Sequence, residues 1–276
     1  MKYADYIKTI EIDSLWSGKK HILWHLDPHV NILSGVNGVG KSTILNRVLQ
    51  SISTKGDLQN HLLKGVHITV EPEDATHIRF DIIRSLDSPV IVTQQENSRL
   101  AEFLPQGAME KASLLDVQLY RLQRKFLDYQ VNIGNRMIEA LQQGHADEAQ
   151  RLSQAKTHFQ DIVDELFQDT GKKVIRTENE IRFALSTGET LLPYNLSSGE
   201  KQMLVILLIV LVEDHQPYVL FMDEPEVSLH IEWQKRLIEL ILDLNPNVQI
   251  ILTTHSPALI MNGWLDNVTE VSDITL

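Results

Sequence analysis

The stretch from Gly35 to Ser42 constrains the fold of this chain more than any other. It reads Gly-Val-Asn-Gly-Val-Gly-Lys-Ser and matches the pattern G-x-x-x-x-G-K-[ST], in which backbone amides and a lysine cradle phosphate groups. Residues 29–33 predict a strand before it and residues 42–50 a helix after it, which is the context that the pattern requires. The alternative is a glycine turn that only joins a strand to a helix. The candidate phosphate-binding residues are Gly35, Asn37, Gly38, Gly40, Lys41, Ser42 and Thr43.

A second anion-binding turn is expected at residues 196–202, which read Leu-Ser-Ser-Gly-Glu-Lys-Gln. We expect Ser198 to cap a helix here, and Gly199 to let the backbone approach an anion because it has no Cβ. Residues 203–212 are apolar without a break but too few to span a bilayer. They predict a helix that is buried on all sides.

Two adjacent carboxylates, Asp223 and Glu224, follow residues 218–222, whose apolar side chains predict a buried parallel strand. Open α/β sheets bind ligands at the carboxyl ends of their strands. One carboxylate of such a pair can hold a hydrated Mg²⁺ while the other acts on water. Together with the glycine-rich stretch, the pair predicts a site for a nucleotide phosphate.

A third candidate for this site is His255. Residues 248–252 predict another buried strand, which should lie beside the strand before the glycine-rich stretch. At the carboxyl end of that strand, an imidazole can donate a hydrogen bond to a phosphate oxygen. A single histidine is more often structural, but its place beside the phosphate site favours the ligand role.

Two further residues have equally good ordinary explanations. Gln94 follows a predicted strand at residues 90–93 and could reach a Mg²⁺ or the attacking water, or it could belong to a polar loop. Trp16 could stack on an adenine base, or it could be a turn residue packed on neighbouring strands. Trp24 competes with Trp16 for the stacking role.

The remaining pattern predicts a mixed α/β chain. Residues 6–12 and 21–26 alternate between apolar and polar and are expected to pair as strands. Residues 108–169 change to helical spacing with a break at 142–145, so we expect a helical hairpin or small lobe inserted between strands. This lobe could be a structural brace or a surface that contacts a partner. Further strands are expected at residues 66–70, 77–84, 172–177, 181–185 and 267–271.

The composition limits the possible partners. Lys and Arg number 25 against 37 Asp and Glu, for a net charge of −12, which argues against non-specific affinity for nucleic acid or anionic membrane over the whole surface but is compatible with a local basic groove. The absence of cysteine excludes disulfides, zinc–thiolate sites and a thiol nucleophile. Neither a signal peptide nor a membrane-spanning segment is expected, so the sequence predicts a cytoplasmic protein with no membrane partner.

Taken together, the motifs resemble those of ABC-type ATPases. The resemblance is to the soluble branch of SMC, RecF and OLD-like proteins, which are AAA family ATPases of the AAA_21-like kind. Transporter subunits usually carry other residue types where Glu226 and His230 stand. The motifs are GVNGVGKST at 35–43 (Walker A), LSSGEKQ at 196–202 (the signature), VLFMDEPEVSLH at 219–230 (Walker B and D-loop) and TTHSP at 253–257.

The resemblance implies an α/β fold, a P-loop NTPase with an ABC ATPase head over residues 1–276. An N-terminal antiparallel β-layer and the inserted helical lobe 108–169 belong to that expectation. The implied cofactors are ATP and Mg²⁺. Lys41 and the backbone amides of residues 38–43 would hold the phosphates, and Ser42 and Asp223 would hold Mg²⁺.

The resemblance also implies a catalytic arrangement. Glu224 would polarise the attacking water, His255 would steady the γ-phosphate, and Gln94 would reach the metal or the water. Ser198 and Gly199 would bind the γ-phosphate that a second copy of the chain holds. ATP would then join two chains into a homodimer with two composite sites.

Three classes of function are compatible with these motifs. The first is an ATP-driven switch for a separately encoded effector, as in OLD-like phage defence or repair, and it is the function we expect. The second is a RecF-like or SMC-like ATPase that binds DNA directly. A transporter subunit is disfavoured by residues 224–230. Residues 256–276 are too few for the nuclease domain of OLD-type proteins, so we expect the effector to bind the lobe.

Overall fold

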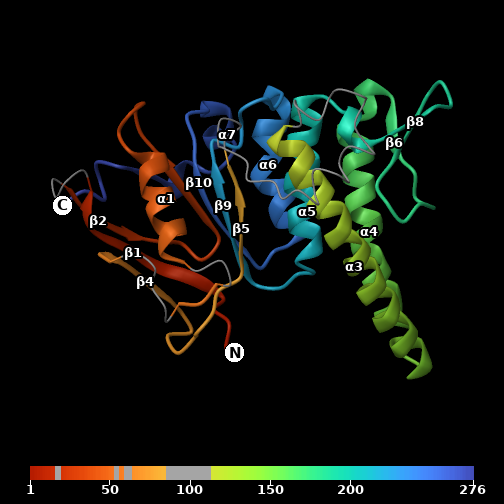
Figure 1. The fold of residues 1–276 in the computed structure, drawn as a ribbon, viewed down its shortest axis with the longest axis horizontal. Helices are drawn as coiled ribbons and strands as arrows, with labels where there is room; N and C mark the ends of the chain where they lie inside the picture. Colours follow the sequence, from red (N-terminus) through yellow and green to blue (C-terminus); the bar gives the residue numbers. More distant parts are fainter. Residues whose placement is uncertain (16–19, 53–55, 59–63, 85–112) are drawn as a thin grey trace. The chain divides into compact units, whose positions relative to one another are not determined.

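The computed structural model describes residues 1–15, 20–52, 56–58, 64–84 and 113–276 (Figure 1). Trp16, Gln94 and the predicted strand 90–93 lie outside the described residues. The described residues form two compact units, which we treat one at a time. The first contains the residues up to 84 and those from 215 onward, and the second contains residues 113–214.

A three-stranded antiparallel layer opens the first unit. It consists of β1 (Tyr6–Leu15), β2 (Lys20–His25) and β4 (Val66–Glu71), in the order β2-β1-β4. The predicted pairing of the first two strands and the predicted N-terminal β-layer are therefore confirmed. Alternation along β1 places Ile10 and Ile12 in the core and Glu11, which lies between them, on the opposite face.

A five-stranded sheet, in which every neighbouring pair is parallel, forms the centre of the first unit. β10 lies between β3 and β9, as expected for the strand that precedes His255. The predicted strand 77–84 is shorter than expected, since only Phe80–Ile83 pairs along the edge. In sheet order, the strands are β11 (Val268–Glu270), β3 (Val30–Ser34), β10 (Val248–Thr253), β9 (Tyr218–Asp223) and β5 (Phe80–Ile83).

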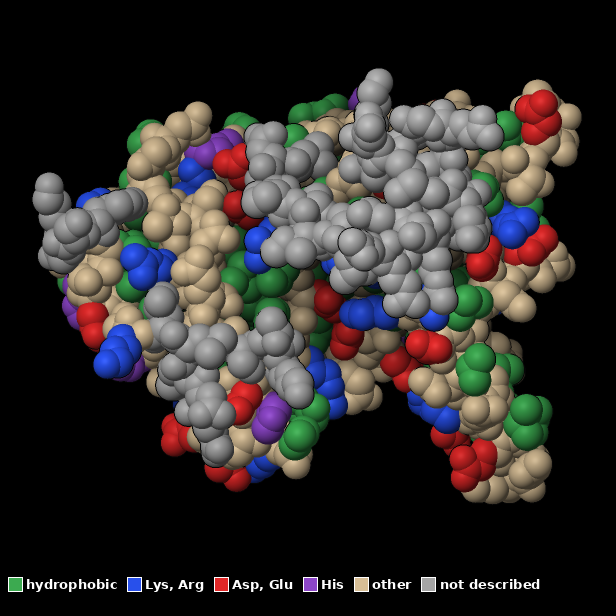
Figure 2. Space-filling view, in the orientation of Figure 1, with side chains coloured by type: hydrophobic (Ala, Val, Ile, Leu, Met, Phe, Trp, Pro, Cys, Tyr) green, Lys and Arg blue, Asp and Glu red, His purple; other side chains and the backbone are tan. Residues whose placement is uncertain are grey.

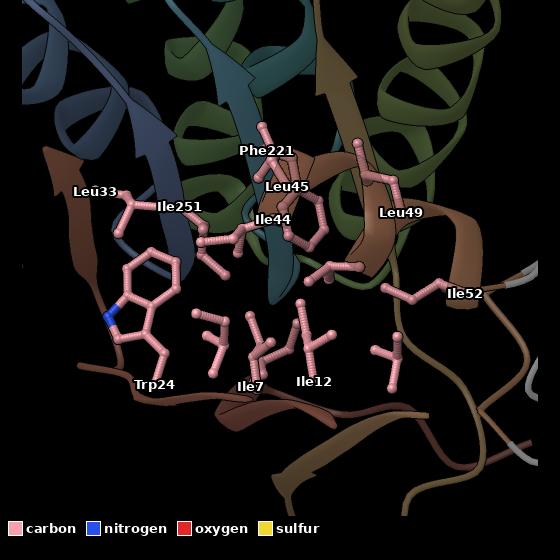
Figure 3. Close-up of a cluster of buried hydrophobic side chains, with 14 of the residues drawn as sticks. Ile7, Ile12, Trp24, Leu33, Ile44, Leu45, Leu49, Ile52, Phe221 and Ile251 are labelled. Carbon is pink, nitrogen blue, oxygen red and sulfur yellow. The ribbon is translucent and has the colours of Figure 1, made fainter. Parts of the chain in front are cut away.

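Helix α1 (Lys41–Ser51) packs in the hydrophobic core of the first unit (Figure 3). Ile44 and Leu45 share that core with Phe221 and Ile251 of the parallel sheet and with the inward side chains of β1. Burial of this face fixes α1 against the sheet, so its first turn has a defined position at the ends of the strands. The other helical segments of this unit are α6 (Ile231–Leu244), α7 (Pro257–Met261) and η4 (Leu265–Asn267).

The second unit is mainly helical. α3 (Leu114–Gln142) and α4 (Ala146–Leu166) form a hairpin, with the break between them close to the predicted position. The apolar positions predicted for one face of the first helix, among them Leu119 and Phe126, are buried as expected. α3 and α4 also pack against α5 (Ser198–Val212). Of residues 203–212, which were predicted to be buried on all sides, 203–211 are buried, and Val212 at the end of the helix is half-buried.

A small antiparallel sheet and two short 3₁₀ helices complete the second unit. The sheet contains β6 (Lys172–Val174), β7 (Phe183–Leu185) and β8 (Thr190–Leu191). The predicted strands at 172–177 and 181–185 are thus shorter than expected, and β8 was not predicted. The short helices are η2 (Gln168–Thr170) and η3 (Pro193–Asn195). Among the described helices, none is long and apolar enough to cross a bilayer.

Candidate nucleotide-binding site

The first turn of α1 provides donors for a phosphate. Its N-cap is Gly40, whose φ of 106° lies in the left-handed region that favours glycine, and no side chain caps the helix. The amides of the first turn therefore have no partner within the helix, and the helix dipole adds positive potential there. A helix that starts in this way is suited to hold a phosphate.

Lys41 brings a positive charge to the same place. Its Nζ donates a hydrogen bond to the carbonyl of Gly35 at 2.9 Å and lies 2.5 Å from Nε2 of His255. Burial lowers the pKa of Lys41 from its ordinary value, while the charges of Glu224 and Asp223 oppose that shift. A bound phosphate would add further negative charge beside this ammonium group and would stabilise its charged form.

The pair of Ser42 and Asp223 is arranged as a metal site requires. Oγ of Ser42 donates to Oδ1 of Asp223 at 2.8 Å, and Oγ1 of Thr253 donates to the same oxygen at 2.5 Å. Adjacent ligands of an octahedral Mg²⁺ lie about 2.9 Å apart, as follows from its bond length of about 2.05 Å. The donor set of hydroxyl and carboxylate oxygens therefore fits the Mg²⁺ that the sequence predicts.

The backbone of Glu224 is held in an unusual conformation. Its φ is 50°, in the left-handed region, and its N–H is held by the carbonyl of Thr253 at 3.1 Å and by Oγ1 of the same residue at 3.2 Å. Its Oε1 lies 3.3 Å from Nε2 of His255. Such a conformation costs about 1–3 kcal/mol in a residue other than glycine, and it is often found at functional sites.

These side chains and backbone groups surround one cavity of about 560 Å³. Two further residues bind side chains that line the cavity. The carbonyl of Gly35 accepts a hydrogen bond from Lys41, and the carboxylate of Asp223 accepts one from Ser42. The structure thus brings together, within the first unit, the residues of three motifs that lie far apart in the sequence. The cavity is lined by Asn37, Gly38, Gly40, Lys41, Ser42, Thr43, Glu224 and His255.

Glu226 is a residue of this region to which the sequence assigned no role. It is buried, and its Oε1 accepts hydrogen bonds from Oγ1 of Thr254 at 2.6 Å and from the backbone N–H of His255 at 2.9 Å. Gln234 adds a second link, because its Oε1 accepts from Oγ of Ser256 and its Nε2 donates to the carbonyl of Leu229. The loop after Glu224 is therefore fastened to the loop that carries His255.

The start of α5 corrects one prediction. Ser197, not Ser198, is the N-cap, and its Oγ accepts from the backbone N–H of Glu200. The carboxylate of Glu200 accepts in return from the N–H of Ser197, which completes a capping box. Ser198 is the first helical residue and is exposed, while Gly199 beside it is buried.

Glu200 is held as a carboxylate inside the second unit. Its side chain is 3% exposed, and Nζ of Lys172 and Oγ1 of Thr170 donate to its Oε1 at 2.7 and 2.9 Å. Burial alone would raise the pKa of Glu200, but the hydrogen bonds from Lys172 and Ser197 hold it below its ordinary value. Lys201 ties the same turn to α3 through Asp116 at 2.7 Å.

Of the three candidates for contact with an adenine or with the attacking water, the structure describes Trp24 alone. Trp16 and Gln94 lie outside the described residues, so their roles stay predictions. Trp24, the alternative to Trp16, is 2% exposed and packs in the core of the first unit (Figure 3). Its indole ring is therefore part of the structural core.

Comparisons with known proteins show the family to which the chain belongs. The family model described as "AAA domain, putative AbiEii toxin, Type IV TA system" matches residues 117–262, more than half of the chain. The chain is 26% identical over 293 residues to the Septu protein PtuA of Bacillus thuringiensis, a match that covers 92% of this chain and 72% of that protein. It is 27% identical over 113 residues to the "Retron Vc95 probable ATPase" of Vibrio cholerae serotype O1 biovar El Tor, covering 37% of this chain and 22% of that protein.

A solved structure gives the same fold. An Smc head bound to the C-winged helix domain of ScpA aligns with a TM-score of 0.52 over 93% of this chain and 92% of that one. The sequence identity is 14%, so this likeness concerns the fold alone. The predicted class, a P-loop ATPase fold of parallel sheet and helices, is confirmed.

Proposed function

Because the chain belongs to this family of AAA domains and is an SMC/OLD-like ATPase, we propose that it binds ATP with Mg²⁺, hydrolyses it and acts as a switch. One observation carries the proposal. Within one unit, a lysine, a hydroxyl–carboxylate pair, a second carboxylate and a histidine converge on a cavity at an uncapped helix start. Such a set fits the phosphates of a nucleotide and the water that attacks them.

The binding step uses donors that are already in position. The amides of residues 38–43 and the ammonium group of Lys41 receive the β- and γ-phosphates. Ser42 and Asp223 would hold Mg²⁺, directly or through water, and a bound ion would supply positive charge to the phosphate oxygens. Lys41 gives up its contact with His255 as the phosphate takes its place beside Nζ.

The chemical step depends on Glu224 and His255. Asp223 is committed to the Ser42 and Thr253 hydroxyls, so Glu224 is the carboxylate of the pair that is left to orient water and draw its proton. His255 turns from Glu224 towards the γ-phosphate and donates a hydrogen bond to it. Glu226 positions His255 by accepting a hydrogen bond from its backbone N–H, and Thr253 positions Glu224 in the same way.

The start of α5 completes the site from a second copy of the chain. Ser198 is exposed at the first turn of a helix, where free amides and a hydroxyl suit an anion. By analogy with the ABC-type ATPases that the motifs resemble, this turn would bind the γ-phosphate held by a partner. ATP then joins two chains head to tail, and hydrolysis releases them.

The switch acts on a separately encoded effector that contacts the α3–α4 hairpin, in OLD-like phage defence or repair. Figure 2 shows hydrophobic side chains among charged ones on this hairpin, and Val131, Ile138 and Leu141 are each more than half exposed. A switch that uses ATP in this way works in the cytoplasm.

The net charge of −12 gives no support for DNA as the direct target.

The test is the variant Glu224→Gln. Removal of the water-orienting carboxylate should lower the rate of phosphate release by about a hundredfold or more, with ATP binding kept, because Lys41 and Ser42 are untouched. Binding is measured with a fluorescent ATP analogue and turnover by phosphate release. Glu232→Gln, at an exposed carboxylate of the same unit, is the control and should behave as the wild type. Near-normal turnover in Glu224→Gln would contradict the assignment.

A further inference from the structure

The outer face of the N-terminal β-layer carries a cluster of metal-binding side chains away from the nucleotide cavity. On β1, Ile10 and Ile12 point into the core, so Glu11 and Asp13 point to the opposite face. Alternation on the neighbouring strands places two histidines on that face as well. His67 of β4 is the direct cross-strand partner of Glu11, and His21 precedes Ile22, the partner of Ile12 on β2.

The four side chains contact one another in two pairs. Nε2 of His21 lies 3.0 Å from Oε1 of Glu11, and Nε2 of His67 lies 3.5 Å from Oδ2 of Asp13. The ligand atoms of Glu11, Asp13 and His21 all lie within 4.8 Å of one another. In a tetrahedral zinc site, donors at about 2.0–2.1 Å from the ion are about 3.3 Å apart, so each pair is already spaced like two ligands of one ion.

We propose that Glu11, Asp13, His21 and His67 form a binding site for a divalent transition metal, with Zn²⁺ as the best match. Two imidazole nitrogens and two carboxylate oxygens suit zinc and its neighbours in the first transition row. Mg²⁺ and Ca²⁺ prefer shells made of oxygen alone. The nucleotide cavity and this face of the β-layer therefore select different ions.

The surroundings leave the two carboxylates available. Among the residues that the structure describes, Glu11 and Asp13 have histidines as their ion-pair partners and no lysine or arginine. The ligands come from three neighbouring hydrogen-bonded strands, so small side-chain rotations bring the two pairs together.

A metal in this place would join β2, β1 and β4 across their outer face. The sheet is already paired by backbone hydrogen bonds, and the ion would add a cross-link between strands that are remote in the sequence. Binding of the ion to the folded layer alone raises the stability of the first unit. The predicted consequence is a melting temperature that rises with zinc whether or not ATP is present.

The test uses the full chain, freed of metal with a chelator and dialysed against ZnCl₂. We expect about one zinc ion per chain with micromolar affinity, measured by equilibrium dialysis and elemental analysis. His21→Ala and Asp13→Asn should each weaken binding at least tenfold, on the order of the losses seen when a metal site is disturbed. His25→Ala is the matched control, because His25 lies on the same strand and faces Thr9 outside the cluster.

Co²⁺ in place of Zn²⁺ supplies a second readout. A four-coordinate site of nitrogen and oxygen ligands gives visible absorption bands, which should disappear in His21→Ala and persist in His25→Ala. Zinc binding that survives unchanged in both His21→Ala and Asp13→Asn would overturn the proposal. Displacement of the zinc by millimolar Mg²⁺ would also overturn it. Circular dichroism of the metal-free variants confirms that each remains folded.

Discussion

Two helices of this protein begin at turns suited to an anion, and they begin in opposite ways. α1 starts at Gly40, which supplies no side chain, so the amides of its first turn keep their hydrogen-bonding capacity. α5 starts at Ser197, whose hydroxyl takes the amide of Glu200 for a capping box. The N–H donors at the start of α1 are therefore available to a ligand. At the start of α5, one N–H donor is used within the helix to fix the geometry of the turn.

The buried charges at the two helix starts also differ, because one is suited to a ligand and the other is already neutralised within the protein. At α1 the buried charge is the ammonium group of Lys41, for which a phosphate is a suitable partner. At α5 the buried charge is the carboxylate of Glu200, which Lys172 already neutralises. We therefore propose that α1 binds a nucleotide, and that α5 presents a rigid surface, Ser198 above all, to a nucleotide held by another chain.

The largest effect is expected at α1. Lys41→Ala removes the charge that the phosphates meet, and it should weaken ATP binding at least a hundredfold, or about 3 kcal/mol, the value of one or two charge-assisted hydrogen bonds. Isothermal titration with ATP and Mg²⁺ measures this. Lys235→Ala, an exposed lysine of the same unit, is the control. If Lys41→Ala bound ATP as tightly as the control, the uncapped start of α1 would have no special role.

The next effect is expected at the ion pair of Lys172 and Glu200, at the first turn of α5, and it concerns the free energy of unfolding instead of ATP binding. Lys172→Met leaves the carboxylate of Glu200 buried without its cation, which should lower the free energy of unfolding by about 2–3 kcal/mol. Urea unfolding followed by circular dichroism gives the value. Lys173→Met, at the exposed neighbouring residue, should change it by less than about 0.5 kcal/mol. ATP affinity should stay at the wild-type level in both variants.

The smallest effect separates two adjacent serines. Ser197→Ala removes the N-cap of α5 and should lower the free energy of unfolding by about 1 kcal/mol. Ser198→Ala should leave stability within about 0.5 kcal/mol of the wild type, because this side chain is exposed and caps nothing. Equal losses in the two variants, measured by the same urea unfolding, would show that the capping box does not hold this turn.

The parts of the fold set by local patterns could be predicted from the sequence. The glycine-rich stretch, the apolar runs before Asp223 and His255, and the helical spacing of the lobe each depend on residues close together in the chain. The sequence contains the Ser-x-x-Glu spacing from Ser197 to Glu200, but the preference of N-caps for serine does not by itself favour Ser197 over Ser198. Either serine satisfies the N-cap preference. Ser197 is the cap because it also exchanges hydrogen bonds with Glu200, which accepts from the N–H of Ser197 and donates its own N–H to the Ser197 hydroxyl.

Contacts between distant segments could not be predicted in this way. Glu226 meets Thr254 because β9 and β10 are neighbours in the sheet, and no periodicity along the chain reports that their following loops touch. His67 meets Glu11 only through the register of β1 and β4. β8 was missed because a strand of two residues has no alternation to detect. In each case tertiary pairing supplies the information.

In the proposed function, ATP hydrolysis needs the α1 cradle of one chain and the α5 start of another. It is tested most directly by mixing two inactive variants, Lys41→Ala and Ser198→Arg, and measuring phosphate release. A mixed dimer has one intact composite site, so the mixture should recover about a quarter of the wild-type rate while each variant alone stays near background. A mixture no more active than its components, or Ser198→Arg active by itself, would contradict the claim.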